Sequence, residues 1–294
     1  MKSFDGVEDI EDAVGLRYWG PDEGGRFFFG AIYLFTTHSE TYRGIVRAEM
    51  PQLRFLLSGS GFYEFPGGRT EAIPDVGLVG PTMKATRFTL RGKARVIGVP
   101  VLPLGWQALG CDAANHWVDR LYDGDPLSDP AFQAQYEALR AAADIDRAVA
   151  GLQAFLGKRL RPVPPSTQRL VSLIDHWLLD GGVPQLDRIV ADTGLSARQL
   201  SRYTNRLYGA PPKLLARKYR ALRCATRIVL EKKNWSELCD GGRFYDQSHF
   251  IREIKQFLGY TPHQLLHEPS TMSRLAAGSR NMVGNLAPLP HPVV

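Results

Sequence analysis

The stretch that decides the fold is residues 194–208, which read GLSARQLSRYTNRLY. Gly194 can take the left-handed backbone conformation that ends one helix, and Ser196 is a favoured N-cap for the next. The residues that follow have helical periodicity. The inward side of this predicted helix consists of Leu200, Tyr203 and Leu207. Its outward side consists of Arg198, Ser201, Arg202 and Asn205. An apolar helix face before the turn, at Leu186, Ile189 and Val190, completes a predicted helix–turn–helix over residues 183–208.

A second stretch of the same kind is residues 244–258, which read FYDQSHFIREIKQFL. Asp246 is a suitable N-cap, and Phe250, Ile254 and Phe257 form the core face of the predicted helix after it. Its outer face near the N-terminus consists of Gln247, Ser248, Ile251 and Arg252. A short helix before it has Leu238 and Cys239 on its inward side. The pattern therefore repeats, and the second helix of such a unit is the element that enters a DNA major groove.

Residues 183–266 resemble the DNA-binding region of the AraC/XylS family of bacterial transcription regulators. The matching strings are residues 194–202 (GLSARQLSR), 208–213 (YGAPPK) and 246–253 (DQSHFIRE), continued by Lys255, Gly259, Thr261 and Pro262. The resemblance implies one long helix over residues 212–231 that joins two helix–turn–helix units. Both recognition helices would then lie on one side of the DNA, in successive major grooves. It also implies promoter DNA and RNA polymerase as partners, and an activator, since most members of the family are activators.

The resemblance assigns roles to individual positions. Base readers would be Arg198, Ser201 and Arg202 in the first unit, and Gln247, Ser248 and Arg252 in the second, with Ile251 against a thymine methyl group. Arg and Gln suit this role because they make bidentate contacts with guanine and adenine, respectively. Phosphate contacts, which position the protein without reading sequence, would come from Ser196, Lys213 and Arg217. Asn205 completes the outward face of the first recognition helix.

One position departs from the pattern of the family. The family usually has Gly-Phe just before the second recognition helix, where this chain has Arg243 and Phe244. The flexible glycines stand earlier, at residues 241–242, so a reshaped or shifted turn is expected there. His249, in the same segment, fits a structural or phosphate-facing role better than a catalytic one.

The charge of the chain is unevenly distributed. Its 294 residues carry a formal net charge of +6, which divides into −3 over residues 1–160 and +9 over residues 161–294. The densest basic run, residues 198–227, contains no Asp or Glu. Such a run can be a solvated helix face, but beside two helix–turn–helix patterns it indicates a polyanion partner.

The length of the chain favours two domains, and a basic, proline-rich stretch at residues 157–165 marks their boundary. We expect an α+β protein. Residues 1–160 form a β-rich effector-sensing or dimerisation domain, a small cupin-like β-barrel with flanking helices. Residues 161–166 are the linker, and residues 167–269 form the all-α domain of two helix–turn–helix units joined by a long helix. The remaining tail, residues 270–294, is expected to be disordered.

Short apolar segments with Gly/Pro turns predict the strands of the first domain. Residues 26–29 and 31–35 are strand-like, and residues 58–60 (SGS) predict a hairpin turn between strands at residues 53–57 and 61–65. Further strands are expected at residues 76–79, 85–90 and 94–99. Residues 106–121 have a helical pattern, and residues 129–160 predict a long helix or a helix pair. The apolar stripe of that segment is expected to pack on the barrel, with a dimer interface as the alternative.

Aromatic residues of the first domain suggest an apolar effector pocket, because binding cavities are mostly apolar with a few polar groups. The candidates are Phe29, Tyr33, Phe55, Phe62, Phe88 and Trp106. The alternative for each residue is that it fills the barrel core.

Several classes of protein are disfavoured. Three dispersed cysteines do not suggest a disulfide framework or a zinc site, and only His38 and His116 lie in the first 160 residues, so neither a metal nor a cofactor is expected. An acidic N-terminus without an apolar run does not resemble a secretory signal, and the longest apolar stretch is too short for a membrane span. We therefore expect a non-enzymatic bacterial protein of the cytoplasm that associates with the nucleoid when bound to DNA.

Two other functions stay open from the residues. One is an enzyme in the first domain with DNA binding as an addition, and the other is a protein-interaction module whose helix–turn–helix region no longer binds DNA. The sequence does not determine whether the chain forms a homodimer.

Overall fold

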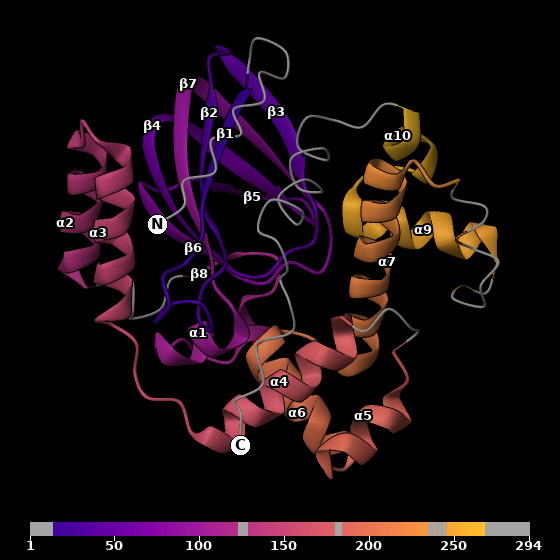
Figure 1. Cartoon of the computed structure of the whole chain (residues 1–294). Coiled ribbons are helices and arrows are strands. Elements are labelled where there is room, and N and C mark those ends of the chain that lie inside the picture. Colours follow the sequence, from indigo (N-terminus) through magenta and orange to yellow (C-terminus); the bar gives the residue numbers. More distant parts are fainter. Residues whose placement is uncertain are drawn as a thin grey trace.

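The computed structural model describes residues 14–122, 129–179, 184–234, 238, 244 and 246–267 (Figure 1). The predicted tail at residues 270–294, the turn at residues 241–243 and Cys239 lie outside the described residues. The architecture is α+β, with an antiparallel β-domain first and a helical region after it, as predicted. No helix in the described part of the chain is long and apolar enough to cross a membrane.

The β-domain is one eight-stranded antiparallel sheet bent into an open barrel. Its strands are β1 (Val14–Trp19), β2 (Ile32–Thr37), β3 (Thr41–Val46), β4 (Gln52–Phe65), β5 (Arg69–Ala72), β6 (Val76–Val79), β7 (Thr86–Pro100) and β8 (Leu121–Tyr122). The order is β1-β2-β7-β4-β6-β8, with β3 paired to the first half of β7 and β5 to the second half of β4. The two long strands, β4 and β7, therefore belong to both halves of the sheet.

Glycines at the middle of β4 and β7 bend the sheet. Gly59 and Gly92 have φ angles of 84° and 73°, which residues with a side chain rarely adopt. The pairing of β4 with β7 shifts register between Leu56 and Ser60, as β-bulges do. The hairpin turn predicted at residues 58–60 is therefore wrong. A glycine with a left-handed backbone can form either a turn or a β-bulge. Gly59 forms a bulge, because β7 continues alongside β4 and pairs with it on both sides of Gly59.

Two other local predictions are wrong. Residues 26–29 form turns and a single bridge from Phe29 to Val101, rather than a strand. Residues 106–121 are not one helix, because a short helix α1 (Pro103–Ala108) is followed by a 3₁₀ turn η1 (Ala114–Trp117) and then by β8. Gly110 separates the first two with a φ angle of 80°, a conformation that ends a helix.

The predicted helix pair before the linker consists of α2 (Pro130–Ala141) and α3 (Ile145–Gly157). Asp129 and Asp144 cap these helices by accepting hydrogen bonds from backbone amides. Their apolar stripe is buried in one core with Phe55 and Ile97 of the barrel wall and with Trp106 of α1. This confirms that the stripe packs on the chain's own barrel.

The helical region consists of α4 (Pro165–Leu179), α5 (Leu186–Thr193), α6 (Ala197–Tyr208), α7 (Pro212–Glu231), α9 (Gln247–Leu258) and α10 (Pro262–His267). The long helix α7 runs between the α5–α6 unit and the α9–α10 unit (Figure 1). The helix α4 begins at Pro165, so its first turn includes the end of the predicted linker.

The helical region packs directly on the β-domain. Met83, Leu104 and Ala108 of the β-domain share a buried core with the α4–α6 region. Ala48 belongs to the core of α7 and α9. Two backbone hydrogen bonds add to this contact, from Ala48 N to the Phe257 carbonyl at 2.7 Å and from Ala85 N to the Gln256 carbonyl at 2.9 Å. Both helix–turn–helix units are therefore held against the β-domain.

Candidate nucleic-acid interface and interdomain cavity

The turn between α5 and α6 is formed as its sequence predicts. Gly194 has a φ angle of 65° and ends α5. Ser196 caps α6: its hydroxyl accepts a hydrogen bond from Gln199 N, and the Gln199 side chain accepts one from Ser196 N. This reciprocal arrangement satisfies two amides that a helix N-terminus leaves free. Leu200 and Leu207 are buried, so they fix the rotation of α6 about its axis.

The outward side of α6 carries the predicted DNA contacts. Arg198 and Arg202 are exposed, whereas Ser201 and Asn205 are partly buried. The Asn205 amide donates to the Ser201 carbonyl at 2.8 Å, so its side chain is bound to its own helix. Lys213, at the start of α7, is exposed. The predicted DNA-contacting side of the helix thus presents Arg198 and Arg202, and arginine is the side chain best suited to bidentate recognition of guanine.

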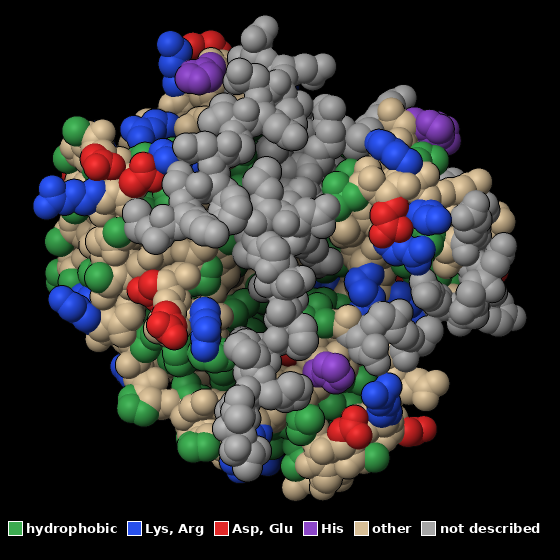
Figure 2. Space-filling model, viewed as in Figure 1, with side chains coloured by type: hydrophobic (Ala, Val, Ile, Leu, Met, Phe, Trp, Pro, Cys, Tyr) green, Lys and Arg blue, Asp and Glu red, His purple; other side chains and the backbone are tan. Residues whose placement is uncertain are grey.

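The second recognition helix, α9, is capped in a similar way. The Asp246 carboxylate accepts a hydrogen bond from His249 N at 2.6 Å, and Phe250, Ile254 and Phe257 are fully buried. The outer side has Gln247, Ser248 and Arg252 exposed, while Ile251 is partly buried against the core of α7 and α9. Figure 2 shows Lys and Arg side chains gathered over the helices around α7 and α9.

A buried carboxylate ties α9 to α7. Glu253 is 1% exposed and accepts from Arg217 Nε at 2.6 Å and from an Arg220 guanidinium nitrogen at 2.8 Å. His249 Nε2 lies 3.1 Å from the same carboxylate. Arg217, predicted to contact phosphate, is thus engaged with Glu253, although its side chain is 43% exposed. The sequence analysis did not predict the ion pair between Glu253 and Arg220. The signal that could have indicated it is an acidic residue beside the apolar positions of a predicted helix.

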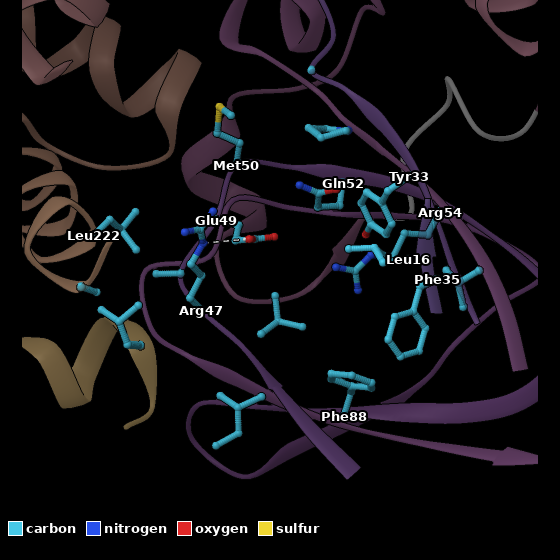
Figure 3. A pocket seen from close by; sticks show the side chains of 18 of the residues that line it. Leu16, Tyr33, Phe35, Arg47, Glu49, Met50, Gln52, Arg54, Phe88 and Leu222 are labelled. Carbon is cyan, nitrogen blue, oxygen red and sulfur yellow. Dashed lines mark hydrogen bonds and ion pairs between the residues drawn. The ribbon is translucent and has the colours of Figure 1, made fainter. Parts of the chain in front are cut away.

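A cavity of about 220 Å³ lies between the barrel and the helical region. Its barrel side includes Tyr33, Phe35 and Phe88, and its other side includes Leu222 and Leu265 from α7 and α10. We call it the interdomain cavity (Figure 3). Two of the predicted pocket residues, Tyr33 and Phe88, line it.

The other four predicted pocket residues do not line this cavity. Phe29, Phe55 and Trp106 are buried in the core that the barrel wall shares with α2 and α3. Phe62 lies beneath the guanidinium of Arg91, at 5.7 Å from ring centre to Cζ. The alternation of side chains along each strand sends Phe55 and Leu56 to opposite faces, and only the long-range pairing decides which face encloses a cavity.

Sequence reasoning also missed the polar residues of the cavity. Tyr33, Gln52, Arg54 and Tyr63 form what we call its polar end. The Arg54 guanidinium donates to the Tyr63 hydroxyl at 2.6 Å. Figure 3 shows Tyr33, Gln52 and Arg54 converging on one side of the cavity, with Leu222 on the opposite side. No sequence spacing indicated this group, because its members come from β2 and from both halves of β4.

Lys218 of α7 joins the two parts of the chain beside the cavity. It is 2% exposed, and its ammonium donates to the carbonyls of Glu49 at 2.7 Å and Thr82 at 2.8 Å. Burial lowers the pKa of Lys218 to about 7, since removing an ammonium from water disfavours its charged form. In the described part of the chain, no three His, Cys, Asp or Glu side chains are grouped as metal ligands.

Comparison with known proteins identifies the helical region. Residues 189–268 match the family model described as "Helix-turn-helix domain", which is of the AraC type. No curated protein matches the chain in sequence.

Solved structures with a similar course of the chain have low identity. An apo variant of ToxT from Vibrio cholerae is 13% identical, with a TM-score of 0.43 over 90% of this chain and 100% of that one. The AraC-like transcriptional activator CuxR is 14% identical, with a TM-score of 0.33 over 77% and 86%. Ectoine synthase from P. lautus is 16% identical, with a TM-score of 0.24 over 34% and 75%.

The family model and the geometry of α5, α6 and α9 define a class. The chain has an AraC-type helix–turn–helix domain over residues 189–268, which includes α6 and α9. It is accordingly a DNA-binding transcription regulator.

Proposed function

We propose that the protein binds promoter DNA with α6 and α9 in successive major grooves, and that a small molecule in the interdomain cavity controls this binding. The observation that carries the first part is the pair of capped helices at either end of one long helix, each with exposed Arg, Gln or Ser side chains near its N-terminus. Arg198 and Arg202 would read bases from α6, and Gln247, Ser248 and Arg252 from α9. Ser196, Lys213 and Arg217 would contact phosphates.

The effector role of the cavity is supported by its position. An occupant would touch the barrel and α7 at once, and α7 connects the two recognition helices. A ligand can shift an equilibrium only by its different affinity for the two states, and a molecule bound between two parts of a chain has such a difference. We further propose that the bound form acts as an activator that contacts RNA polymerase, in a monomer or a homodimer.

The first experiment is selection of bound sequences from a random DNA pool with the purified chain at near-physiological salt. An enriched motif with two elements about one helical turn, ~34 Å, apart would support readout by both helices. A single enriched element would assign base reading to one helix only. The absence of any enriched motif would contradict the proposed function.

Variants then separate base reading from phosphate binding. Arg202→Ala should cost about 1–3 kcal/mol of binding free energy and relax the preference at one base position. Lys213→Ala should weaken binding to all sequences and reduce the slope of log K against log salt by about 1. The matched control is Arg140→Ala on α2, an exposed arginine on the far side of the barrel from α9 (Figure 1). An equal loss on every sequence for Arg202→Ala would reassign that residue to phosphate contact.

A further inference from the structure

The helix α10 is held in place by a cap and by one buried side chain. The Thr261 hydroxyl accepts a hydrogen bond from Gln264 N at 3.2 Å, and the Gln264 side chain accepts one from Thr261 N at 2.9 Å. Leu265 is 1% exposed and belongs to the core of α7 and α9. Burial of Leu265 sets the rotation of α10 about its axis, so the opposite side of the helix faces solvent.

His263 and His267 occupy this opposite side. Each residue of an α-helix turns the chain by about 100°, so both histidines lie about 200° around the axis from Leu265. Both are exposed, and Figure 2 shows histidine side chains at the surface over α10. The centres of their imidazole rings are 4.5 Å apart, and the ring planes meet at 44°. The helix thus presents two imidazoles side by side, as residues four positions apart do.

The distance between the two rings matches that of a metal chelate. A metal lies about 2.0 Å from a ligating imidazole nitrogen, and hence about 3.2 Å from the centre of that ring. Ring centres 4.5 Å apart then subtend an angle of about 90° at a metal that both rings hold. Neighbouring ligands make this angle in square-planar and octahedral coordination, whereas a tetrahedral site would need ring centres about 5.2 Å apart.

We propose that His263 and His267 form a chelating site for Cu²⁺ or Ni²⁺ on the surface of the α9–α10 unit. Imidazole is a suitable ligand for both ions, and tetragonal sites with nitrogen and oxygen ligands are typical of them. Two protein ligands leave the remaining coordination positions to water, so the ion is exchangeable, unlike the zinc of a closed four-ligand site. This site is separate from the interdomain cavity, and the inference does not rest on the proposed function.

Pairing distinguishes these two histidines from the others. Of the seven histidines in the chain, only His263 and His267 stand three or four positions apart. A second ligand on the same helix binds the ion at a high effective concentration, which a single imidazole lacks. His249 does lie beside a carboxylate, but that carboxylate, of Glu253, already has two arginine partners, whose charge disfavours a cation there. The sequence analysis expected no metal from the cysteines and from residues 1–160, and this pair lies outside both.

The experiment is titration calorimetry of the untagged full chain with NiCl₂, with CuCl₂ and MgCl₂ as parallel titrations. One Ni²⁺ should bind per chain, and Cu²⁺ should bind more tightly, in the order typical of nitrogen ligands. Mg²⁺, which prefers oxygen ligands, should not bind to the pair. A folded chain that binds neither Ni²⁺ nor Cu²⁺, or that binds Mg²⁺ as tightly as Ni²⁺, would overturn the proposal.

Variants locate the two ligands. His263→Gln and His267→Gln each keep a polar, exposed side chain but remove the chelate, so each should weaken Ni²⁺ binding by about tenfold or more. His38→Gln, which changes an exposed histidine after β2, is the matched control and should leave the affinity unchanged. The melting temperature without metal checks that each variant folds. Unchanged affinity in either folded α10 variant, or an equal loss in His38→Gln, would contradict this placement of the site.

A second measurement tests the site through stability. An ion that bridges His263 and His267 needs the folded helix, so Ni²⁺ should raise the melting temperature of the unchanged chain with increasing concentration. The same concentrations should have little effect on His267→Gln. Equal shifts for the two proteins would show that Ni²⁺ binds elsewhere and would overturn the proposal.

Discussion

At the scale of single residues, Asp175 of α4 has a pKa that burial shifts far from its ordinary value. The Tyr208 hydroxyl donates to its carboxylate at 2.7 Å, across the packing of α4 on α6. Burial raises the pKa of Asp175 to about 7, although this hydrogen bond acts in the opposite direction. Tyr208 itself ends α6, so the pair connects the first recognition helix to α4.

This pair predicts a pH dependence of stability. Between pH about 4 and 7 the folded state keeps a proton on Asp175 that the unfolded state has lost, so the contribution of Asp175 to folding decreases as pH rises. Asp175→Asn keeps an acceptor for Tyr208 but cannot titrate. The melting temperature of this variant relative to the unchanged chain should therefore rise from pH about 5 to 8. A difference that stays constant over this range would contradict the raised pKa.

At the scale of elements, three glycines end α5, α6 and α9 with left-handed backbones but in different surroundings. Gly194, Gly209 and Gly259 have φ angles of 65°, 84° and 82°. A Cβ on Gly194 would meet nothing within 4 Å. On Gly209 it would lie 2.5 Å from the Pro81 ring, and on Gly259 it would lie 2.6 Å from Ile45. Both recognition helices thus end in close contact with the β-domain.

The three positions provide a matched series of Gly→Ala variants. Gly194→Ala should cost about 1 kcal/mol of unfolding free energy, which is the cost of a left-handed alanine alone. Gly209→Ala and Gly259→Ala should cost more, because each also forces a recognition helix away from the β-domain. Chemical denaturation measures all three. Equal losses across the series would show that the contacts with Pro81 and Ile45 contribute nothing.

The orientation of α9 also depends on an ion-pair network between α9 and α7. Glu253 accepts from Arg217 and Arg220 of α7 while it is almost fully buried. Removal of one arginine would leave the buried Glu253 carboxylate with less compensation, so this network holds α9 against α7. The second recognition helix is therefore positioned by α7 and by the β-domain together.

At the scale of the whole molecule, Lys218 connects the helical region to two loops of the β-domain through the carbonyls of Glu49 and Thr82. Burial lowers the pKa of Lys218 from 10.5 to about 7. Between these two pH values the unfolded state binds a proton that the folded state has released. The contribution of Lys218 to folding therefore increases as pH rises from about 7 to 10.5 and is lost as pH falls.

Lys218→Met tests this connection, since Met is of similar length and cannot titrate. The variant should lack the rise in stability above pH about 7, and the two carbonyls that lose their donor should cost about 1–3 kcal/mol. Urea denaturation of both proteins at pH about 7 and 9 gives the comparison. Parallel pH profiles for the two proteins would contradict the lowered pKa.

What the sequence by itself determined is the local structure of the helix–turn–helix region. The caps at Ser196 and Asp246, the helix end at Gly194 and the buried faces of α6 and α9 all depend on residues within about four positions of one another, so their periodicity is visible without the fold. The order of a β-rich domain before a helical one followed from the same local patterns.

Only the tertiary structure decided the rest. Residues 58–60 look like a turn, and they form a bulge because β7, some 35 residues away, pairs on both sides of them. The polar end of the cavity combines Tyr33 of β2 with Arg54 and Tyr63 of β4, and Lys218 finds its partners 136 and 169 residues away. Strand pairing and domain packing bring such groups together, so their spacing in the sequence does not predict the group. The sequence of a strand shows which side chains alternate, but not which face of the sheet will enclose a cavity.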